Sequence, residues 1–302
     1  MSLTGAGFTS TFQKHLETLF RHGGKTIMNR SLFTILLSMC VLLTCSPVLA
    51  ADSVIRVGGS GTCTGVMKHL ASEFEKRNPG VRITMAPSLG SSGGIKALLG
   101  GSLDIALSAR PLKDDEKTTG ASTVFSGRSP FAFMVNRNVT LTGITTKELE
   151  SIYGLQKQSW QDGSAIRLVL RPDGDSDTKI VQAISPELSQ AYKYALSQPG
   201  MQIALTDQDS DKSIVRTPGA IGGTTLAQHL TDKLDGKLLA FNSAKPTLKG
   251  LKDGSYPLYK KQIVIVIPSK TNPAITKYIS FINSPQAARI WEKYGVHPDG
   301  RN

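Results

Sequence analysis

Three loops rich in glycine and in hydroxyl side chains could bind a small oxyanion. They cover residues 59–65, 90–94 and 171–178, and each lies between a predicted strand and a predicted helix. The N-terminus of a helix leaves backbone N–H groups without partners and carries partial positive charge. Glycine lets an anion approach those groups closely, and serine and threonine hydroxyls add donors. The third loop adds Arg171, whose guanidinium can hold a tetrahedral oxyanion through two hydrogen bonds.

Each loop also has an ordinary structural explanation. Serine, threonine and glycine before a helix commonly serve as N-caps and turns, so one such loop alone indicates structure only. Three such loops occur together, and one of them contains an arginine. This combination supports a binding site as strongly as it supports a purely structural role. The chemistry requires no metal, and His69, His229 and His297 do not have the spacing of a metal site. We therefore expect no metal and no cofactor.

Alternating strands and helices must position these loops. Strands are predicted at residues 54–57, 81–85 and 103–107, with helices at 65–76 and 95–99 between them. This order predicts a parallel sheet covered by helices, with ligands at the carboxyl ends of the strands. Further strands are predicted at residues 131–135, 166–170 and 262–267, and further helices at 145–153 (with Thr145 and Glu148 at capping-box spacing), from 179 onward, and over 273–294.

Composition indicates a globular protein. The chain has 302 residues, of which 39% are hydrophobic and 19% charged, so it can bury one large core or two ordinary ones. The formal net charge is +12, but the basic residues are scattered and are not interleaved with aromatics. Nucleic acid is therefore not an expected partner. A diffuse positive field would instead attract an anionic ligand.

The N-terminal region has the order of a secretory signal. Residues 28–50 comprise a basic start, an uncharged apolar run and small residues before a cleavage point after Ala50. The apolar run is shorter than the ~20 residues that a membrane-spanning helix needs, so a retained anchor is the weaker alternative. Residues 1–27 precede this signal and are interpreted as a misassigned start or a leader, with a genuine extension as the alternative.

Cysteine usage fits an exported protein without disulfides. Cleavage after Ala50 removes Cys40 and Cys45 and leaves Cys63, so no intramolecular disulfide is expected. Cys45 could alternatively be a lipoprotein cysteine, but Thr44 is a poor residue before one.

A series of motifs follows one another in a characteristic order. They are Gly61-Thr62, Leu89 to Ile95, Asp104 to Leu112, Arg171 to Gly174, and Gly219 to Gly222. From residue 54 to residue 294, this order resembles the periplasmic phosphate-binding proteins of phosphate ABC transporters, within the wider family of type II solute-binding proteins. The resemblance implies an α/β, two-lobed periplasmic-binding-protein-like fold (type II) with a ligand cleft between the lobes. It implies a binding protein and not an enzyme.

The resemblance also implies which residues contact the ligand. The implied contacts are Thr62, the backbone of Cys63, Ser91, Ser92, Gly93, Arg171, Ser176, Asp177 and Thr178. Asp173 would orient Arg171. Ser108 and Arg110 are further candidates at the end of a strand, although Arg110 before Pro111 could equally be a surface arginine.

Two departures from the family pattern bear on selectivity. Ala109 stands where the family usually has an aspartate that accepts the proton of hydrogen phosphate. Asp175 and Asp177 are extra carboxylates in the third loop, and a carboxylate beside a bound anion is repulsive unless it accepts a proton from it. Our hypothesis is that one of them replaces the missing acceptor; the alternative is that both face solvent. A sulfate, molybdate or tungstate receptor is the alternative function.

A serine hydrolase is the rival from another class. Residues 90–94 fit the Gly-x-Ser-x-Gly pattern, which would make Ser92 a nucleophile with His229 or His297 as its base. The hydroxyl-rich partner loops and the export signal favour binding.

The two lobes are predicted to come from separated segments. The first lobe would comprise residues 51–130 plus 262–302, and the second lobe residues 131–261, joined by crossover strands. Such proteins close around the ligand by hinge motion. The implied partners are inorganic phosphate or a similar oxyanion and an ABC transporter permease. The protein is expected to be a periplasmic monomer.

Overall fold

The fold of residues 53–300 is seen in a computed structural model. The predicted signal segment, with Cys40 and Cys45, lies outside these described residues. Between residues 53 and 300, no helix is both long enough and apolar enough to cross a membrane.

The strands form one large mixed sheet. Eight of its ten strands have the order β2-β1-β3-β11-β4-β8-β6-β7, and the other two, β9 and β12, each pair with β4. β1 is parallel to both β2 and β3, as predicted, whereas β11 is antiparallel to β3 and β4. β10 and β5 form a separate parallel pair. The strands are β1 (Ser53–Gly59), β2 (Val81–Met85), β3 (Ile105–Ser108), β4 (Ser122–Asn136), β5 (Gly143–Ile144), β6 (Arg167–Leu170), β7 (Gln202–Ile203), β8 (Ala220–Thr225), β9 (Gly236–Leu238), β10 (Ala240–Phe241), β11 (Tyr259–Val266) and β12 (His297–Pro298).

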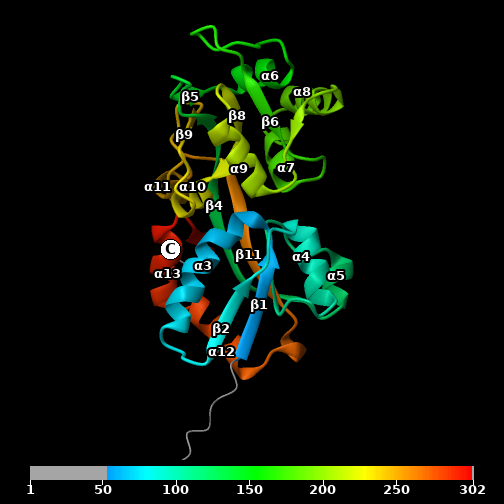
Figure 1. The fold of residues 1–302 in the computed structure, drawn as a ribbon, viewed down its shortest axis with the longest axis vertical. Helices are drawn as coiled ribbons and strands as arrows, with labels where there is room; N and C mark the ends of the chain where they lie inside the picture. The colour runs from blue at the N-terminus through cyan, green and yellow to red at the C-terminus, as the bar shows by residue number, and fades with distance from the viewer. Residues whose placement is uncertain (1–52, 301–302) are drawn as a thin grey trace, which may run out of the picture. The chain divides into compact units, whose positions relative to one another are not determined.

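Helices flank both parts of this sheet (Figure 1). Figure 1 shows α3, α4 and α5 beside β1 and β2, and α6, α7, α8 and α9 around β6 and β8. The helices are α3 (Gly61–Glu75), α4 (Gly90–Leu99), α5 (Asp114–Thr118), α6 (Thr146–Tyr153), α7 (Ser176–Gln182), α8 (Pro186–Ser197), α9 (Asp207–Arg216), α10 (Leu226–Thr231), α11 (Leu248–Asp253), α12 (Pro273–Ile282) and α13 (Pro285–Lys293), with a short 3-10 helix, η1 (Pro268–Lys270).

The long strand β4 pairs first with β11 and then with β8. Up to Pro130, which lies opposite Tyr259, β4 pairs with β11. From Phe131, which lies opposite Thr225, it pairs with β8. The segments before and after this point belong to different hydrophobic cores.

Two principal cores lie on either side of this change. The first core is built from the N-terminal and C-terminal segments and contains Ile55, Leu70 and Trp291, all at most 1% exposed. The second core is built from the middle of the chain and contains residues such as Phe133 and Leu188, both fully buried. A chain of this length can bury two cores of ordinary size.

Three helices begin earlier than the sequence predicted. α3 begins at Gly61, α4 at Gly90 and α7 at Ser176, so the glycine-rich segments form the first turns of helices rather than loops before them. Glycine and serine have low helix propensity, which is why the pattern placed the helix starts later. Tight packing explains one of these glycines: a Cβ on Gly94 would lie 2.4 Å from the Cα of Gly59 in β1.

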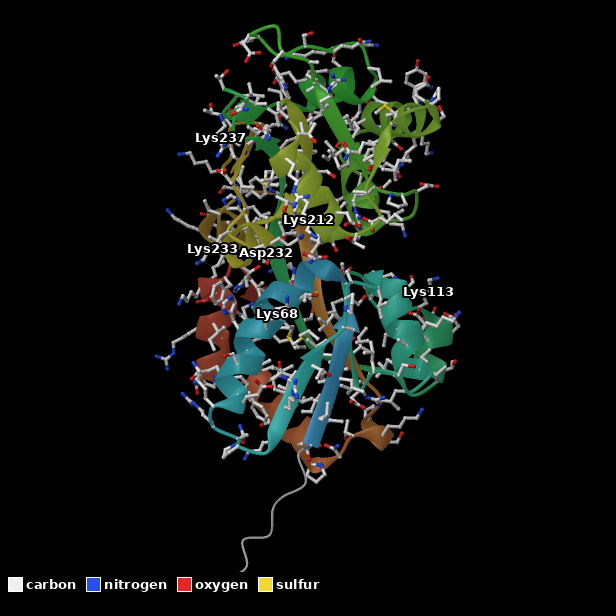
Figure 2. The ribbon with its side chains drawn as sticks, viewed as in Figure 1. Lys68, Lys113, Lys212, Asp232, Lys233 and Lys237 are labelled. Atoms are coloured by element: carbon white, nitrogen blue, oxygen red, sulfur yellow. The ribbon has the colours of Figure 1, made fainter. Side chains whose placement is uncertain are left out.

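Basic side chains are spread over separate elements, as they are in the sequence. Figure 2 shows Lys68 on α3, Lys212 on α9 and Lys237 on β9. They do not form one basic stripe along a single helix.

Candidate functional site

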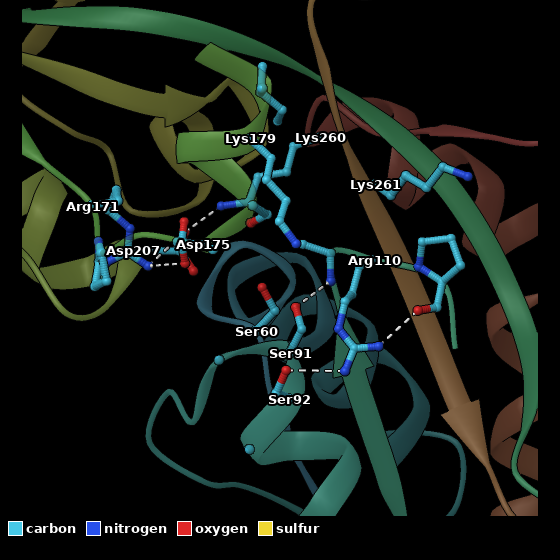
Figure 3. A pocket seen from close by; sticks show the side chains of 18 of the residues that line it. Ser60, Ser91, Ser92, Arg110, Arg171, Asp175, Lys179, Asp207, Lys260 and Lys261 are labelled. Carbon is cyan, nitrogen blue, oxygen red and sulfur yellow. Dashed lines mark hydrogen bonds and ion pairs between the residues drawn. The ribbon is translucent and has the colours of Figure 1, made fainter. Parts of the chain in front are cut away.

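A cavity of about 610 Å³ brings the second and third glycine-rich segments together. Figure 3 shows Ser91, Ser92 and Arg110 on one side, with Arg171, Asp175 and Asp207 across from them. The cavity is lined by Ser60, Leu89, Gly90, Ser91, Ser92, Gly93, Ala109, Arg110, Pro111, Arg171, Pro172, Asp173, Gly174, Asp175, Ser176, Lys179, Ile180, Ala183, Asp207, Tyr259, Lys260 and Lys261. Five of these side chains are cationic and three are carboxylates, so the lining favours an anion by charge.

The first turn of α4 forms one wall. No side chain caps this helix, since its N-cap residue is Leu89. The Oγ of Ser91 accepts a hydrogen bond from the N–H of Ala109 at 2.9 Å, and the Oγ of Ser92 accepts one from Nη2 of Arg110 at 3.1 Å. These bonds join the α4 turn to the end of β3. An uncapped helix N-terminus beside two hydroxyls is suited to binding an anion.

Arg110 is held in this wall by Glu116. Nη1 and Nη2 of Arg110 donate to the two carboxylate oxygens of Glu116 at 2.8 and 2.7 Å. The hydrogen bond from Arg110 lowers the pKa of Glu116 to about 2, so both groups stay charged. Arg110 is therefore part of the cavity wall and not the free surface arginine considered above.

Arg171 forms the opposite wall and is almost entirely buried. Its Nη1 donates to the carbonyl of Ala204 at 2.6 Å, and its Nη2 donates to Asp175 at 2.9 Å. Its backbone N–H donates to the hydroxyl of Tyr192 at 2.9 Å. Its Nε is buried without a hydrogen-bond partner among the described residues. Arg171 thus lines the cavity from a fixed position.

A cluster of buried charges lies beside Arg171. Nζ of Lys260, which is 2% exposed, lies 2.5 Å from an oxygen of Asp177 and 2.5 Å from an oxygen of Asp207. Burial disfavours the ammonium ion, but the two carboxylates outweigh burial and raise the pKa of Lys260. Burial raises the pKa of Asp177 to about 6 although Lys260 opposes this shift. The cluster therefore contains one carboxylate that titrates near neutral pH.

The first glycine-rich segment lies outside the cavity except for Ser60. The N–H of Thr62 donates to Oδ2 of Asp207 at 3.1 Å, and its hydroxyl contacts the hydroxyl of Thr225 at 3.2 Å. The N–H of Cys63 donates to the carbonyl of Ser60 at 3.2 Å. Thr62 and the backbone of Cys63, which were expected to contact the ligand, thus form their hydrogen bonds within the protein.

The eleven predicted contact residues fall into two groups. Ser91, Ser92, Gly93, Arg110, Arg171 and Ser176 line the cavity. The other five are buried away from it: Thr62, Cys63, Ser108, Asp177 and Thr178.

The buried polar residues have structural partners of their own. The Oγ of Ser108 donates to the carbonyl of Arg110 at 2.6 Å and so shapes the turn after β3. The Oγ1 of Thr178 donates to the carbonyl of Pro172 at 2.9 Å and contacts Tyr192. The alternative in which both extra carboxylates face solvent is wrong, because Asp177 is 3% exposed and Asp175 lines the cavity.

Sequence reasoning missed Asp207 and Lys260. Lys260 alternates with Gln262 and Val264 in β11, so these three side chains share one face of the strand and all are buried. A lysine and a glutamine on the apolar face of a strand are a signal that could have indicated a buried polar site. Asp207 had no such signal, because an acid in the first turn of a helix is ordinary.

Neither the hydrolase chemistry nor a reactive thiol has support in this arrangement. Ser92 is bonded by a guanidinium and not by a histidine. Burial raises the pKa of Cys63 to about 12, which keeps its thiol protonated. Within residues 53–300, no group of three histidine, cysteine or acidic side chains is arranged to hold a metal ion.

Comparison with known proteins gives a consistent result. A family model described as the PBP superfamily domain matches residues 46–286. The chain is 23% identical over 252 residues to the phosphate-binding protein PstS of Borreliella burgdorferi, covering 81% of this chain and 89% of that protein. It is 27% identical over 263 residues to protein SphX of Synechococcus elongatus, covering 78% and 73%.

A solved structure supports the same architecture. A substrate-binding protein from Clostridium perfringens, solved with bound phosphate, superposes with a TM-score of 0.68 at 21% identity, covering 82% of this chain and 99% of that one. The predicted two-lobed α/β fold class is confirmed.

Proposed function

This chain belongs to the PBP superfamily, and we propose that it is a receptor that captures phosphate outside the cytoplasmic membrane for an ABC-type importer. The main observation that supports this proposal is the cavity of about 610 Å³ in which the uncapped first turn of α4 faces Arg171. The names of the relatives support phosphate as the ligand. In this role the protein binds its ligand without reacting with it, as a monomer that delivers the ligand to a permease.

The proposed ligand contacts come from both walls. Ser91, Ser92 and Gly93 offer hydroxyl and backbone donors at a helix N-terminus, where anions are favoured. Arg171 lines the cavity with its guanidinium, and Ser176 lines the cavity as well.

Selectivity for phosphate would rest on Asp175. This carboxylate lines the cavity and pairs with Arg171 at 2.9 Å, whereas Asp177 is buried against Lys260. Asp175 could accept the proton of hydrogen phosphate, which fully ionised sulfate lacks. Alanine at Asp175 should then reduce the preference for phosphate over sulfate, and an unchanged preference would contradict this role.

The lobes and the hinge follow from the sheet. We assign residues 51–130 plus 262–302 to the first lobe and residues 131–261 to the second lobe. The change of partner in β4 between Pro130 and Phe131 supports the first of these boundaries. β11 begins at Tyr259, three residues before residue 262, where the second boundary lies. Export through a cleaved signal at 28–50 belongs to the same proposal.

Calorimetric titration with phosphate, sulfate, molybdate and tungstate tests the proposed function. We expect tight phosphate binding that weakens by about 2–5 kcal/mol in Arg171→Ala, the usual effect of truncating a buried charged contact. Arg167→Ala is the matched control, because Arg167 starts β6, the strand that ends just before Arg171, and is exposed. Circular dichroism must show that both variants fold. Preference for a fully ionised oxyanion would identify the alternative receptor class, and failure to bind any of the four would refute the proposal.

A further inference from the structure

The two hydroxyl groups in the first turn of α4 both accept hydrogen bonds from the segment that follows β3. The Oγ of Ser91 accepts from the N–H of Ala109 at 2.9 Å, and the Oγ of Ser92 accepts from Nη2 of Arg110 at 3.1 Å (Figure 3). A hydroxyl directs its proton away from an N–H donor, because the two hydrogens carry like partial charges. Within residues 53–300, neither hydroxyl donates to a protein acceptor. Both protons can therefore point into the cavity that the two serines line.

The guanidinium of Arg110 is held in place by Glu116 and by the backbone. Nη1 and Nη2 donate to the two carboxylate oxygens of Glu116 at 2.8 and 2.7 Å, and Nη1 also donates to the carbonyl of Pro111 at 2.9 Å. Glu116 is itself fixed at the start of α5, because the N–H of Lys113 donates to its Oε2 at 2.8 Å. Nη2 thus bridges Glu116 and Ser92 from a defined position.

The terminal N–H groups of Arg110 are all used within the protein. Each terminal nitrogen of a guanidinium carries two hydrogens. Nη1 uses them on Glu116 and Pro111, and Nη2 uses them on Glu116 and Ser92. A two-point grip on an oxyanion needs at least one terminal N–H. Glu116 also balances the charge of Arg110, so the pair adds no net charge to this wall of the cavity. Arg110 can therefore act on a ligand through Ser92 and not as a second clamp beside Arg171.

We propose that Arg110 is a positioning residue, held by Glu116, which makes the hydroxyl of Ser92 a hydrogen-bond donor to the captured oxyanion. The inference rests on the proposed function and gives Arg110 a different role from the direct contact that the sequence predicted. The guanidinium also polarises the hydroxyl, because hydrogen bonds in a chain strengthen one another. Since Ser91 offers its proton in the same way, the α4 wall presents donors to the ligand. The oxygen of hydrogen phosphate that carries the proton then faces Asp175 across the cavity.

A double-mutant cycle tests whether Arg110 acts through Ser92. Arg110→Gln combined with Glu116→Gln removes the guanidinium and its carboxylate together, so the net charge of the wall does not change. Calorimetric titration measures its effect in the wild-type protein and in Ser92→Ala, with inorganic phosphate, or with sulfate if the wild-type protein prefers it. Asp114→Asn combined with Lys117→Gln is the matched control, because it removes an exposed ion pair of the same helix outside the cavity lining. Circular dichroism must show that each variant folds. If the paired substitution does not fold, Arg110→Lys replaces it, because lysine keeps the charge and lacks the planar fork.

The expected result is that the effect of the paired substitution depends on Ser92. Ser92→Ala should weaken binding roughly 10- to 100-fold, the usual effect of losing a hydrogen bond to a charged group. The paired substitution should weaken binding about 3- to 30-fold in the wild-type protein and less than about 2-fold in Ser92→Ala, because residues that act through one contact are not additive. The control should change binding less than about 2-fold in both proteins.

Two results would overturn the inference while leaving phosphate capture intact. Equal weakening in the wild-type protein and in Ser92→Ala would show that Arg110 acts on the ligand without Ser92. No weakening in the wild-type protein would show that the ion pair does not position the hydroxyl. A wild-type protein that binds sulfate and not phosphate would refute the proposed function, and the cycle with sulfate would still decide the role of Arg110. A wild-type protein that binds neither oxyanion would refute both.

Discussion

Replacing Lys260 with methionine removes the cation that Asp177 and Asp207 share, with little change in side-chain length. Nζ of Lys260 lies 2.5 Å from each carboxylate, and the residue is 2% exposed. Without it, the two acids keep Arg171 as their nearest cation, at 3.9 and 4.0 Å. Removing one partner of a buried ion pair typically costs about 3–5 kcal/mol. We expect Lys260→Met to lower the free energy of unfolding by that amount.

Urea unfolding followed by tryptophan fluorescence measures this loss. In a thermal scan the same loss corresponds to a fall in Tm of about 6–20 °C, because each kcal/mol shifts a domain of this size by about 2–4 °C. Lys261→Met is the matched control: it changes the neighbouring residue of the same strand, which is half-buried and points to the other face. The control should change stability by about 0.5 kcal/mol or less.

The stability loss of Lys260→Met should increase with pH. Without Lys260 the pKa of both carboxylates rises, that of Asp177 from about 6. An acid with a raised folded pKa contributes stability that is complete below its unfolded pKa of about 4 and is lost as pH rises through the folded pKa. The deficit of Lys260→Met should therefore be larger at about pH 8 than at about pH 5. Equal losses in Lys260→Met and Lys261→Met, or a deficit independent of pH, would refute the reasoning.

Three further predictions concern stability and packing. Burial raises the pKa of Asp211 to about 8. The stability of the wild-type protein should therefore fall by up to about 1.4 kcal/mol per pH unit between about pH 5 and about pH 8. Asp211→Asn should reduce this pH dependence, as measured by Tm against pH. Tyr192→Phe leaves the buried N–H of Arg171 without its acceptor and should cost about 1–3 kcal/mol in urea unfolding; a change under about 0.5 kcal/mol would show that water replaces the hydroxyl. Gly94→Ala places a Cβ 2.4 Å from the backbone of β1 and should lower Tm. Gly101→Ala is the control, because a Cβ there meets nothing within 4 Å and only its φ of +76° is unfavourable, so it should cost only about 1 kcal/mol. Equal effects of the two substitutions would contradict the packing argument.

Local patterns in the sequence predicted local structure well. Thr145 and Glu148 form the expected capping box at the start of α6, because all of its hydrogen bonds lie within four residues. The alternation of strands and helices likewise predicted the parallel arrangement of β1, β2 and β3, since short right-handed connections leave few other topologies.

The site was predicted in part because only some of its contacts are local. Ser91, Ser92 and Arg171 line the cavity as expected, since each lies in a segment at the carboxyl end of a strand. The contact of Thr62 with Asp207 joins residues 145 positions apart, and that of Lys260 with Asp207 joins residues 53 apart. No periodicity or short motif carries information about such pairs, so the partner of Thr62 could not be foreseen.

Pro130 lies at the point where β4 exchanges β11 for β8. A proline contributes no backbone N–H, so the ladder has no hydrogen bond from this residue to lose when the strand bends there. Sliding the two halves of β4 past their neighbours would instead break bonds along its whole length. The strand therefore resists shear along its length. Bending at Pro130 costs the ladder no hydrogen bond from that residue.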